Sequence, residues 1–221
     1  MKFWTNSICA AALLAAPAAA QQPSLFEREP QGWVHVMPGA KLEGWTRLKI
    51  KSEAEDSARQ WQRNGDILLC AGDGGHDWIR YDTPLEDFVF HAEYRFTPIE
   101  GDPRYNSGVF VRNTADYSRW YQAQVGPAGG FLFGIGEENG EPKRFNTRDQ
   151  LKGDRTKPAG EWNVIEVTAR GPVLSVWLNG AVVSEWDQCP VRRGHIGLEG
   201  EGFRIEFRNL KVKRLAASPV Q

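Results

Sequence analysis

Apolar and polar residues alternate along much of the chain, as they do in a β-strand that buries one face. The pattern is clearest from Phe88 to Phe96, where every second residue is aromatic or alanine. The residues between them include His91, Glu93 and Arg95. We therefore predict a strand over 88–96 that turns its aromatic set into a core and presents the charged set on the opposite face.

Segments of the same kind follow at short intervals, separated by turn residues. Asn64-Gly65 and Asn179-Gly180 each predict a tight hairpin, because both residue types tolerate the positive φ of a type I′ turn. Only residues 53–60 suggest a helical turn. Short strands with Gly, Asn and Pro between them predict an all-β sandwich or barrel. The other predicted strands are 61–63, 67–71, 108–112, 121–125, 164–169, 174–178, 182–186, 195–198 and 204–214.

The first twenty residues have the composition of a signal peptide. Lys2 precedes an apolar run over 8–16, and Ala18-Ala19-Ala20 then offers a small-residue cleavage site. The run is shorter than the roughly 20 apolar residues of a membrane span. We predict a signal peptide over 1–20, a periplasmic or secreted protein, and no membrane span. The remaining chain divides into a lead-in at 21–32, one sandwich domain at 33–215 and a tail at 216–221.

The charge of the chain bears on its binding partners, and its cysteine content bears on disulfide bonding. The chain has 27 Lys and Arg against 28 Asp and Glu, and no basic stripe, so nucleic acid is not an expected partner. Cys70 and Cys189 remain after the predicted signal peptide. An oxidising compartment permits them to pair, while two buried thiols are the alternative. Export favours the hypothesis of a disulfide between them.

The chain lacks the short motifs of nucleotide, zinc or serine-nucleophile sites. AGDGGHD at 71–77 places aspartates among glycines, but its spacing matches no calcium loop, and we predict a flexible turn there. No resident cofactor is expected. A divalent metal is the alternative, although the sequence shows no strong ligand set for one.

Polar side chains fall on the non-core face of three predicted strands. Glu93 and Arg95 lie on the first, Arg112 on the second, and Gln122 and Gln124 on the third. If these strands are neighbours, their amide and guanidinium groups form a face rich in fixed donors and acceptors, which suits sugar hydroxyls. The alternative is an ordinary solvated face with a weak Glu–Arg pair.

Further side chains complete this candidate carbohydrate site. Asn106 and Ser107 precede the second strand, and Gly108 lets a ligand approach the backbone. Aromatic and imidazole rings can supply an apolar wall for a pyranose ring. The candidates for that wall are His76, Trp78, Trp120 and Tyr121.

A set of ordered segments carries a family resemblance over nearly the whole of the chain after residue 37. They are PGAKLEGW at 38–45, WQRNGDILLCAG at 61–72, DFVFHAEYRF at 87–96, NSGVFVR at 106–112, EWNVIEV at 161–167, VWLNG at 176–180 and IGLEGEGFRIEFRNLKVKRL at 196–215. With them the chain resembles the 3-keto-disaccharide hydrolase family, formerly domain of unknown function 1080. The resemblance implies a concanavalin A-like jelly roll with a substrate groove on its concave sheet. It also implies action on glycosides oxidised to a ketone at carbon 3.

By motif position, the resemblance places Glu93, Arg95, Asn106, Ser107, Arg112, Gln124 and Glu201 on family-typical positions. Two positions depart from the family: it often has Glu where this chain has Gln122, and Gln where this chain has Glu199. The loss of a carboxylate at 122 would remove a potential base or metal ligand, which bears on catalysis and not on the fold.

The implied reaction begins at the acidified proton on carbon 2. A base removes it, the enolate expels the glycosidic oxygen from carbon 1, and water adds back. We expect Glu93 to be the base, with a pKa raised by desolvation, and Arg112 or Arg95 to stabilise the enolate. Glu201 or His76 would serve the leaving group. The remaining substrate-binding candidates are Trp78, Asn106, Ser107, Trp120, Gln122, Gln124 and Glu199.

Two other functions use the same residues. Ordinary glycoside hydrolysis would pair Glu93 with Glu199 or Glu201 across the scissile bond. A lectin-like carbohydrate-binding module would use the groove without an activated base, and the fold alone does not separate binding from catalysis.

Overall fold

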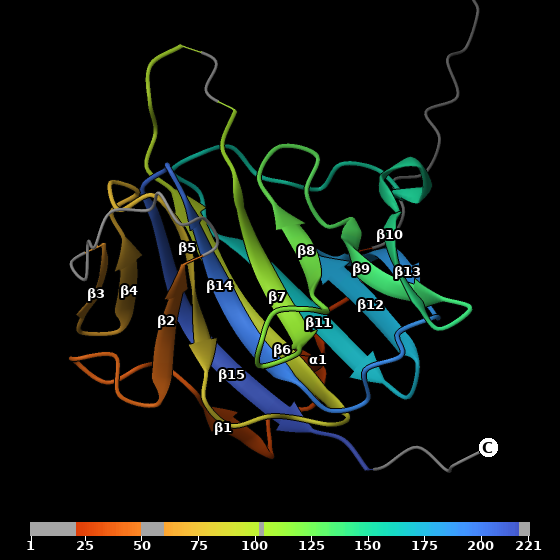
Figure 1. Ribbon diagram of the computed structural model, residues 1–221. Helices are drawn as coiled ribbons and strands as arrows, with labels where there is room; N and C mark the ends of the chain where they lie inside the picture. The colour runs from red at the N-terminus through yellow and green to blue at the C-terminus, as the bar shows by residue number, and fades with distance from the viewer. Residues whose placement is uncertain (1–20, 50–59, 102–103, 217–221) are drawn as a thin grey trace, which may run out of the picture.

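Two antiparallel sheets packed face to face make up the protein (Figure 1). The computed structural model describes residues 21–49, 60–101 and 104–216. Nearly all regular structure in these ranges is β-strand, which confirms the predicted all-β sandwich. The predicted signal peptide and residues 53–59 of the predicted helical turn lie outside the described residues.

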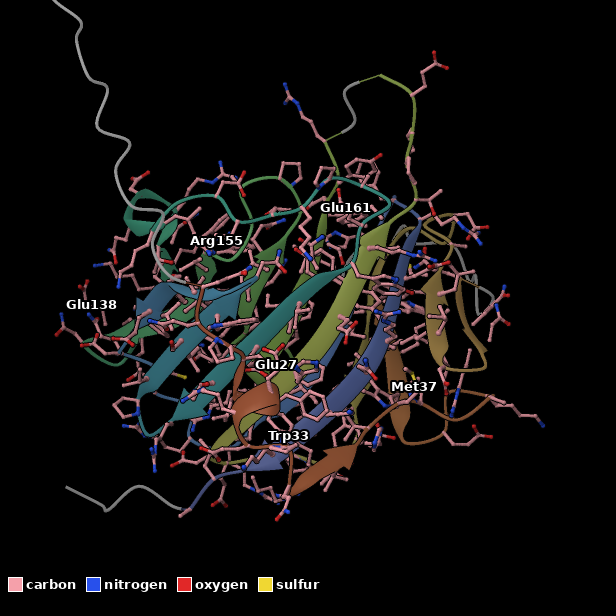
Figure 2. All side chains as sticks on the ribbon, turned by 180° about the vertical axis from the view of Figure 1, so that it is seen from behind. Glu27, Trp33, Met37, Glu138, Arg155 and Glu161 are labelled. Carbon is pink, nitrogen blue, oxygen red and sulfur yellow. The ribbon has the colours of Figure 1, made fainter. Side chains whose placement is uncertain are left out.

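The eight-stranded sheet carries the N-terminal segment on its outer face. The order along its main path is β13-β12-β11-β6-β15-β4-β3, and β1 pairs with β15. Figure 2 shows the short helix α1 (Leu25–Arg28) and β1 (Trp33–His35) in front of this sheet. The other strands are β3 (Trp61–Asn64), β4 (Ile67–Cys70), β6 (Phe88–Phe96), β11 (Asn163–Arg170), β12 (Val173–Leu178), β13 (Ala181–Trp186) and β15 (Ile205–Arg214).

The seven-stranded sheet closes the other side of the sandwich. Its order is β10-β9-β8-β7-β14-β5-β2. One 3-10 turn, η1 (Arg148–Gln150), follows β10. The strands are β2 (Trp45–Lys49), β5 (His76–Tyr81), β7 (Ser107–Asn113), β8 (Tyr121–Val125), β9 (Leu132–Glu138), β10 (Glu141–Asn146) and β14 (His195–Glu201).

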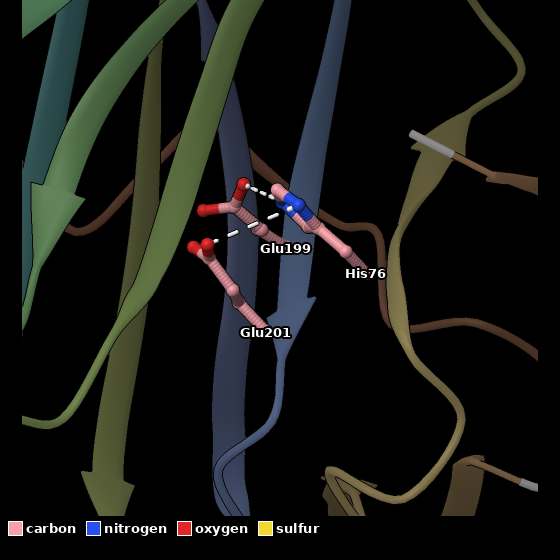
Figure 3. Close-up of side chains that lie close together, drawn as sticks. All are labelled: His76, Glu199 and Glu201. Carbon is pink, nitrogen blue, oxygen red and sulfur yellow. Dashed lines mark hydrogen bonds and ion pairs between the residues drawn. The ribbon is translucent and has the colours of Figure 1, made fainter. Parts of the chain in front are cut away.

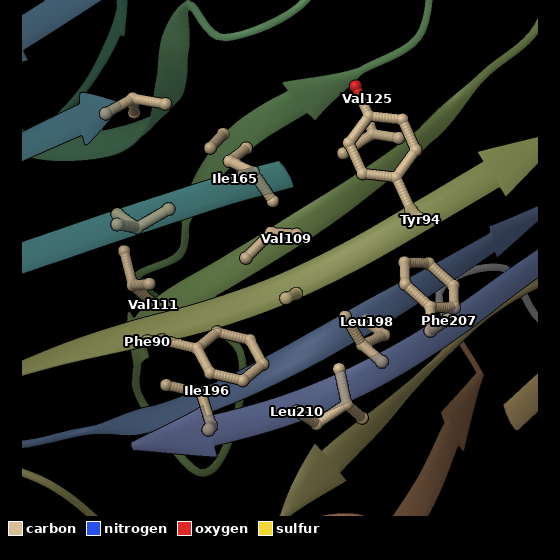
Figure 4. Packing of buried hydrophobic residues seen from close by; sticks show 14 of the residues in the cluster. Phe90, Tyr94, Val109, Val111, Val125, Ile165, Ile196, Leu198, Phe207 and Leu210 are labelled. Atoms are coloured by element: carbon tan, nitrogen blue, oxygen red, sulfur yellow. The ribbon is translucent and has the colours of Figure 1, made fainter. Parts of the chain in front are cut away.

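Alternate residues of both sheets meet in one core. In β6, the five predicted core residues from Phe88 to Phe96 are each at most 5 % exposed. Phe90 packs near Ile196 of the facing sheet and Leu210 of its own sheet (Figure 4). The period-two pattern therefore identified the buried face of β6 correctly.

One predicted neighbour relation is wrong. β7 and β8 are paired in the seven-stranded sheet, but β6 lies across the sandwich between β11 and β15. Both sheets of a sandwich bury one face, so alternation shows which side chains enter the core. It does not show which sheet a strand joins.

The second hairpin turn has the predicted geometry. Leu178 pairs with Ala181, and the two residues between them, Asn179 and Gly180, have φ of 42° and 103°. The first hairpin turns one residue later than predicted. Asn64 is still paired with Ile67, so Gly65 and Asp66 form the loop, and Gly65 takes the positive φ of 61°.

The two cysteines do not form the hypothesised disulfide: Cys70 and Cys189 are both free and buried. Cys70 ends β4, whereas Cys189 follows β13 and donates a hydrogen bond to the Val191 carbonyl at 3.3 Å. Burial raises the pKa of both thiols, which keeps them protonated and unreactive. In the described part of the chain, no helix is long and apolar enough to cross a membrane.

The core assignment predicts a large cost for truncating Phe90. The side chain is fully buried between the sheets, so Phe90→Ala should lower the free energy of unfolding by ~3–5 kcal/mol through lost burial and a residual cavity. Denaturant titration of both proteins measures this difference. An unchanged midpoint would contradict the assigned core face.

Candidate functional site

Three acid–base side chains gather on the outer face of the seven-stranded sheet, which we call the site face. β5 and β14 pair so that His76 stands opposite Glu201, and Trp78 stands opposite Glu199. Figure 3 shows the side chains of His76, Glu199 and Glu201 close together. His76 Nε2 lies 2.7 Å from Glu199 Oε1, and His76 Nδ1 lies 3.8 Å from Glu201 Oε1. Strand alternation directs Ile196 and Leu198 into the core and so directs these carboxylates outward.

Amide side chains from β8 and from the chain before β7 hold the two carboxylates. Gln122 Nε2 donates to Glu199 Oε2 at 2.7 Å, and Asn106 Nδ2 donates to Glu201 Oε2 at 2.6 Å. Gln124 Nε2 in turn donates to Asn106 Oδ1 at 2.6 Å. Hydrogen bonds and the His76–Glu201 ion pair therefore link side chains of β5, β8 and β14 with Asn106, which precedes β7.

Gly108 makes the bond between Gln122 and Glu199 possible. The Gln122 side chain lies directly over Gly108, and a Cβ added there would stand 2.1 Å from its Nε2. A glycine in a strand permits such a close approach. Ser107, the neighbouring residue, donates its hydroxyl to the Glu199 carbonyl at 2.8 Å. The sequence suggested that Gly108 admits a ligand, but here it admits a side chain of the site.

The two carboxylates have different surroundings. Glu199 is 3 % exposed, and burial raises its pKa. The hydrogen bond with His76 opposes that rise, while the charge of Glu201 adds to it. The Glu201 side chain is 32 % exposed, and its Oε1 lies 3.8 Å from His76 Nδ1, which is beyond hydrogen-bond distance. Two carboxyl groups in contrasting environments are a common arrangement for acid–base chemistry.

A buried aspartate holds β5 in place beneath His76. Asp77 points into the protein and is fully buried. Its Oδ1 accepts hydrogen bonds from Gln60 Nε2 at 2.6 Å and Trp61 Nε1 at 2.9 Å, and its Oδ2 pairs with Arg47. The segment 71–77, predicted as a flexible turn, thus ends in the first two residues of an anchored strand.

An aromatic cluster adjoins the acid–base cluster on the site face. Trp78 and Phe110 are buried at its base, with ring centroids 5.1 Å apart. Tyr117, from the loop between β7 and β8, lies 5.3 Å from Trp78 and stacks on Trp120 at 5.8 Å with an interplanar angle of 5°. Phe133 completes the cluster against Trp120. Trp78 therefore lies buried beneath the other rings of the cluster and does not present an exposed surface to a sugar ring.

The acid–base cluster also has the composition of a cation site. One ligand atom each from His76, Glu199 and Glu201 lies within 4.8 Å of the other two. One imidazole and two carboxylates suit divalent transition metals, and three protein ligands leave positions for water or substrate. The donor set therefore fits a divalent cation, although the ligands come from segments 123 residues apart that show no local motif.

Glu93 and Arg95 lie on the other sheet, so the expectation that they share a face with the site is wrong. Glu93 accepts hydrogen bonds from Arg208 Nε at 2.7 Å and Asn209 Nδ2 at 2.6 Å. These residues form a bulge in β15 where Asn209 has a φ of 51°. Arg95 pairs with Glu206 at 2.6 Å. Both side chains lie on the outer face of the eight-stranded sheet, where they make these ion pairs and hydrogen bonds.

The pKa of Glu93 moves opposite to the expected direction. Burial alone would raise it, but His91 at 3.9 Å and the hydrogen bonds from Asn209 and Arg208 outweigh burial and lower the pKa to about 2. A carboxylate this weakly basic is a poor acceptor for a carbon-bound proton. Its chemistry is that of a structural anion that closes a β-bulge.

Arg112 is also a structural residue. β7 pairs with β14 through a register shift that sets two residues, 111 and 112, opposite Ile196, and Arg112 takes a φ of 53°. The fully buried guanidinium donates to the carbonyls of Glu86, Gly171 and Val191 and pairs with Asp87 at 2.7 Å. Strand parity predicted the site face for Arg112, and the bulge redirects it.

The structure thus brings most of the predicted site together and removes four members, of which Tyr121 is buried in the core between the sheets. The predicted residues that it brings together are His76, Trp78, Asn106, Ser107, Trp120, Gln122, Gln124, Glu199 and Glu201. Glu93, Arg95 and Arg112 lie elsewhere. Sequence reasoning missed Phe110, Tyr117 and Phe133, and Tyr117 has no local signal because it belongs to an irregular loop.

The departure at Gln122 does not leave the site without a carboxylate. Glu199, the other departure from the resembled family, lies within hydrogen-bond distance of Gln122. The two positions form one amide–carboxylate pair, with the carboxylate on β14 in this chain.

Two cavities lie away from the cluster. One of about 230 Å³ is lined by β9, β10 and Trp186, and one of about 530 Å³ lies on the eight-stranded sheet around Trp177 and α1. Neither contains His76, Glu199 or Glu201. We place the candidate site at the cluster, because acid–base groups in a hydrogen-bonded network identify a site better than volume does.

The chain belongs to the family described as the 3-keto-alpha-glucoside-1,2-lyase-like domain, which matches residues 32–213. No curated protein matches the chain by sequence.

Solved structures share the fold. A putative glycosyl hydrolase from Parabacteroides distasonis has a TM-score of 0.61 at 15 % identity, over 89 % of this chain and all of that one. The carbohydrate-binding module CBM66 from Bacillus subtilis has a TM-score of 0.54 at 16 % identity, over 77 % and 95 %. The κ-carrageenase of Pseudoalteromonas carrageenovora has a TM-score of 0.55 at 8 % identity, over 91 % and 98 %. These likenesses confirm the concanavalin A-like jelly-roll class, and the family match supports a carbohydrate-related function.

The role of Glu93 can be tested by the pH dependence of stability. The pKa of Glu93 in the folded protein is lowered to about 2 from its ordinary value of 4.5. The resulting stabilisation is therefore present above pH ~4.5 and lost as the pH falls towards 2. Glu93→Gln should cost about 1–3 kcal/mol in free energy of unfolding at pH 7, and the difference from the parent should shrink below pH ~4.5.

Denaturant titrations at several pH values measure this difference. Glu185→Gln, which removes an exposed carboxylate from β13, is the matched control and should change stability by less than ~0.5 kcal/mol. A cost for Glu93→Gln that is equal at pH 7 and pH 3 would contradict the assigned role.

Proposed function

We propose that this protein cleaves glycosides whose sugar carries a ketone at carbon 3, with the acid–base cluster of the site face as its catalytic centre. The observation that carries the proposal is the contact of His76, Glu199 and Glu201 within a network of amide side chains. Family membership supports the substrate class. We also propose that the protein acts outside the cytoplasm, on the basis of the signal-peptide sequence of residues 1–20.

The ketone makes elimination accessible to such a cluster. It acidifies the proton on carbon 2, and a base of ordinary strength can remove that proton when the enolate oxygen is stabilised. The enolate then re-forms the ketone and expels the glycosidic oxygen from carbon 1. Water adds to carbon 1 and carbon 2 regains a proton, so the net reaction is hydrolysis. An unoxidised glycoside has no acidic proton on carbon 2 and cannot follow this route.

We assign proton removal to the unit of His76, Glu199 and Glu201. Within it, Glu201 has the most accessible carboxylate, while both oxygens of Glu199 already accept hydrogen bonds. Glu199 and His76 therefore position the unit, and Glu201 meets the substrate. The amide of Asn106 lies beside Glu201 and has a second N–H to offer to a sugar hydroxyl.

A bound divalent cation would polarise the ketone and neutralise the developing enolate charge. The assay below is therefore run with and without a chelator, and with added Mn²⁺ or Zn²⁺.

The substrate class is tested by comparing a 3-keto glucoside with its unoxidised parent. We expect turnover of the keto compound alone. Replacement of the hydrogen on carbon 2 by deuterium should slow the reaction several-fold, because that bond breaks during elimination. Binding of the keto glycoside without turnover under every metal condition would refute the enzyme and favour a carbohydrate-binding module. Equal turnover of both glycosides would refute the elimination route.

The catalytic unit is tested by Glu201→Gln. This change preserves size and hydrogen bonding but removes the basic oxygen, so turnover should fall by ~10²–10⁴ with an unchanged fold. Glu206→Gln, on the other sheet, is the matched control and should retain the parent rate. Rates and circular dichroism of the three proteins decide the matter. A parent-like rate in Glu201→Gln would exclude this residue as the base.

A further inference from the structure

Tyr117 projects from an irregular loop onto the site face, although it lies in no strand. Its ring is enclosed by Trp78 at 5.3 Å, Phe110 at 5.8 Å and Trp120 at 5.8 Å. Trp78 stands opposite Glu199 in the pairing of β5 with β14. These contacts hold the ring beside the acid–base cluster.

The backbone at Tyr117 is strained. Its φ of 61° lies in the left-handed region, which is a genuine outlier for a bulky residue. The loop holds it there: the Tyr117 amide donates to the Thr114 carbonyl, and Asp116 Oδ1 accepts from the amide and hydroxyl of Ser118. Strain that a rigid loop maintains next to a cluster of acid–base groups is a recognised mark of a functional position.

The hydroxyl group of Tyr117 makes no hydrogen bond to the described residues and keeps its proton. Among the described residues its oxygen has no hydrogen-bond partner. Burial raises the pKa of Tyr117, and the charges of Glu199 and Glu201 raise it further. The phenol therefore keeps its proton at neutral pH, and it lies within electrostatic reach of both carboxylates.

We propose that Tyr117 is the general acid that gives its proton to the departing glycosidic oxygen. The inference rests on the proposed function, since it names a further catalytic residue for the same reaction. In this step the bond between carbon 1 and the glycosidic oxygen breaks, a double bond forms between carbons 1 and 2, and the phenolic proton passes to the leaving oxygen. The phenolate then takes a proton from the water that adds to carbon 1, which restores the phenol.

Tyr117 is assigned as the acid because the reaction needs a proton donor that is separate from the base. The cluster of His76, Glu199 and Glu201 accepts the proton from carbon 2, so a separate donor must serve the oxygen on carbon 1. Among the residues that the structure gathers around the cluster, Tyr117 alone carries a free acidic hydroxyl. A departing alkoxide is more basic than a phenolate, so a phenol with a raised pKa still transfers its proton to it.

The test compares leaving groups in the full-length protein. Tyr117→Phe keeps the ring and its packing but removes the proton. With an alkyl or sugar 3-keto glucoside, turnover should fall by about 10²-fold or more. With 4-nitrophenyl 3-keto glucoside, whose leaving oxygen needs no proton, the loss should be at least tenfold smaller.

Tyr81→Phe is the matched control, because Tyr81 packs on Trp45 from the same strand as His76 but faces away from the cluster. It should retain the parent rate with both substrates. Equal losses for both leaving groups in Tyr117→Phe, or no loss, would overturn the role of Tyr117. Parent protein that turns over neither substrate would instead overturn the proposed function itself, so the two failures are distinguishable.

Discussion

The antiparallel pairing of β5 with β14 is the constraint on which the site depends. It sets His76 opposite Glu201 and Trp78 opposite Glu199, and therefore determines which side chains can touch. The register is itself held from below, because Asp77 is fixed by Gln60, Trp61 and Arg47 on the core side. A shift of one residue would turn the carboxylates of β14 into the core and its leucine and isoleucine outward, at a prohibitive cost.

The two outer faces of the sandwich use similar polar residues for different purposes. On the eight-stranded sheet, Glu93 is saturated by Arg208 and Asn209 and stabilises a bulge. On the seven-stranded sheet, Glu201 accepts a hydrogen bond from Asn106 and remains partly exposed. A carboxylate with several cationic or amide donors loses basicity. The number and charge of neighbours therefore separate a structural anion from a catalytic candidate.

Irregular backbone redirects two of the residues that matter most. The bulge at Arg112 removes a guanidinium from the site face and inserts it among the carbonyls of Glu86, Gly171 and Val191. The strained loop at Tyr117 does the reverse and delivers a phenol to that face. In both cases a positive φ at a non-glycine residue marks the departure from regular strand backbone.

The sequence by itself determined the fold class, most of the strands and the buried faces of β6 and β8, because alternation and turn residues act locally. It also identified Asn106, Gln122, Gln124, Glu199 and Glu201 as candidates from their parity or motif positions, and His76 as a ring that could adjoin a sugar. Only the tertiary structure decided which candidates meet. Sheet membership, register and bulges depend on pairings between segments far apart in the chain, as between His76 and Glu199. Local patterns carry no information about such pairings, so Glu93 was separated from the site and Tyr117 was added to it.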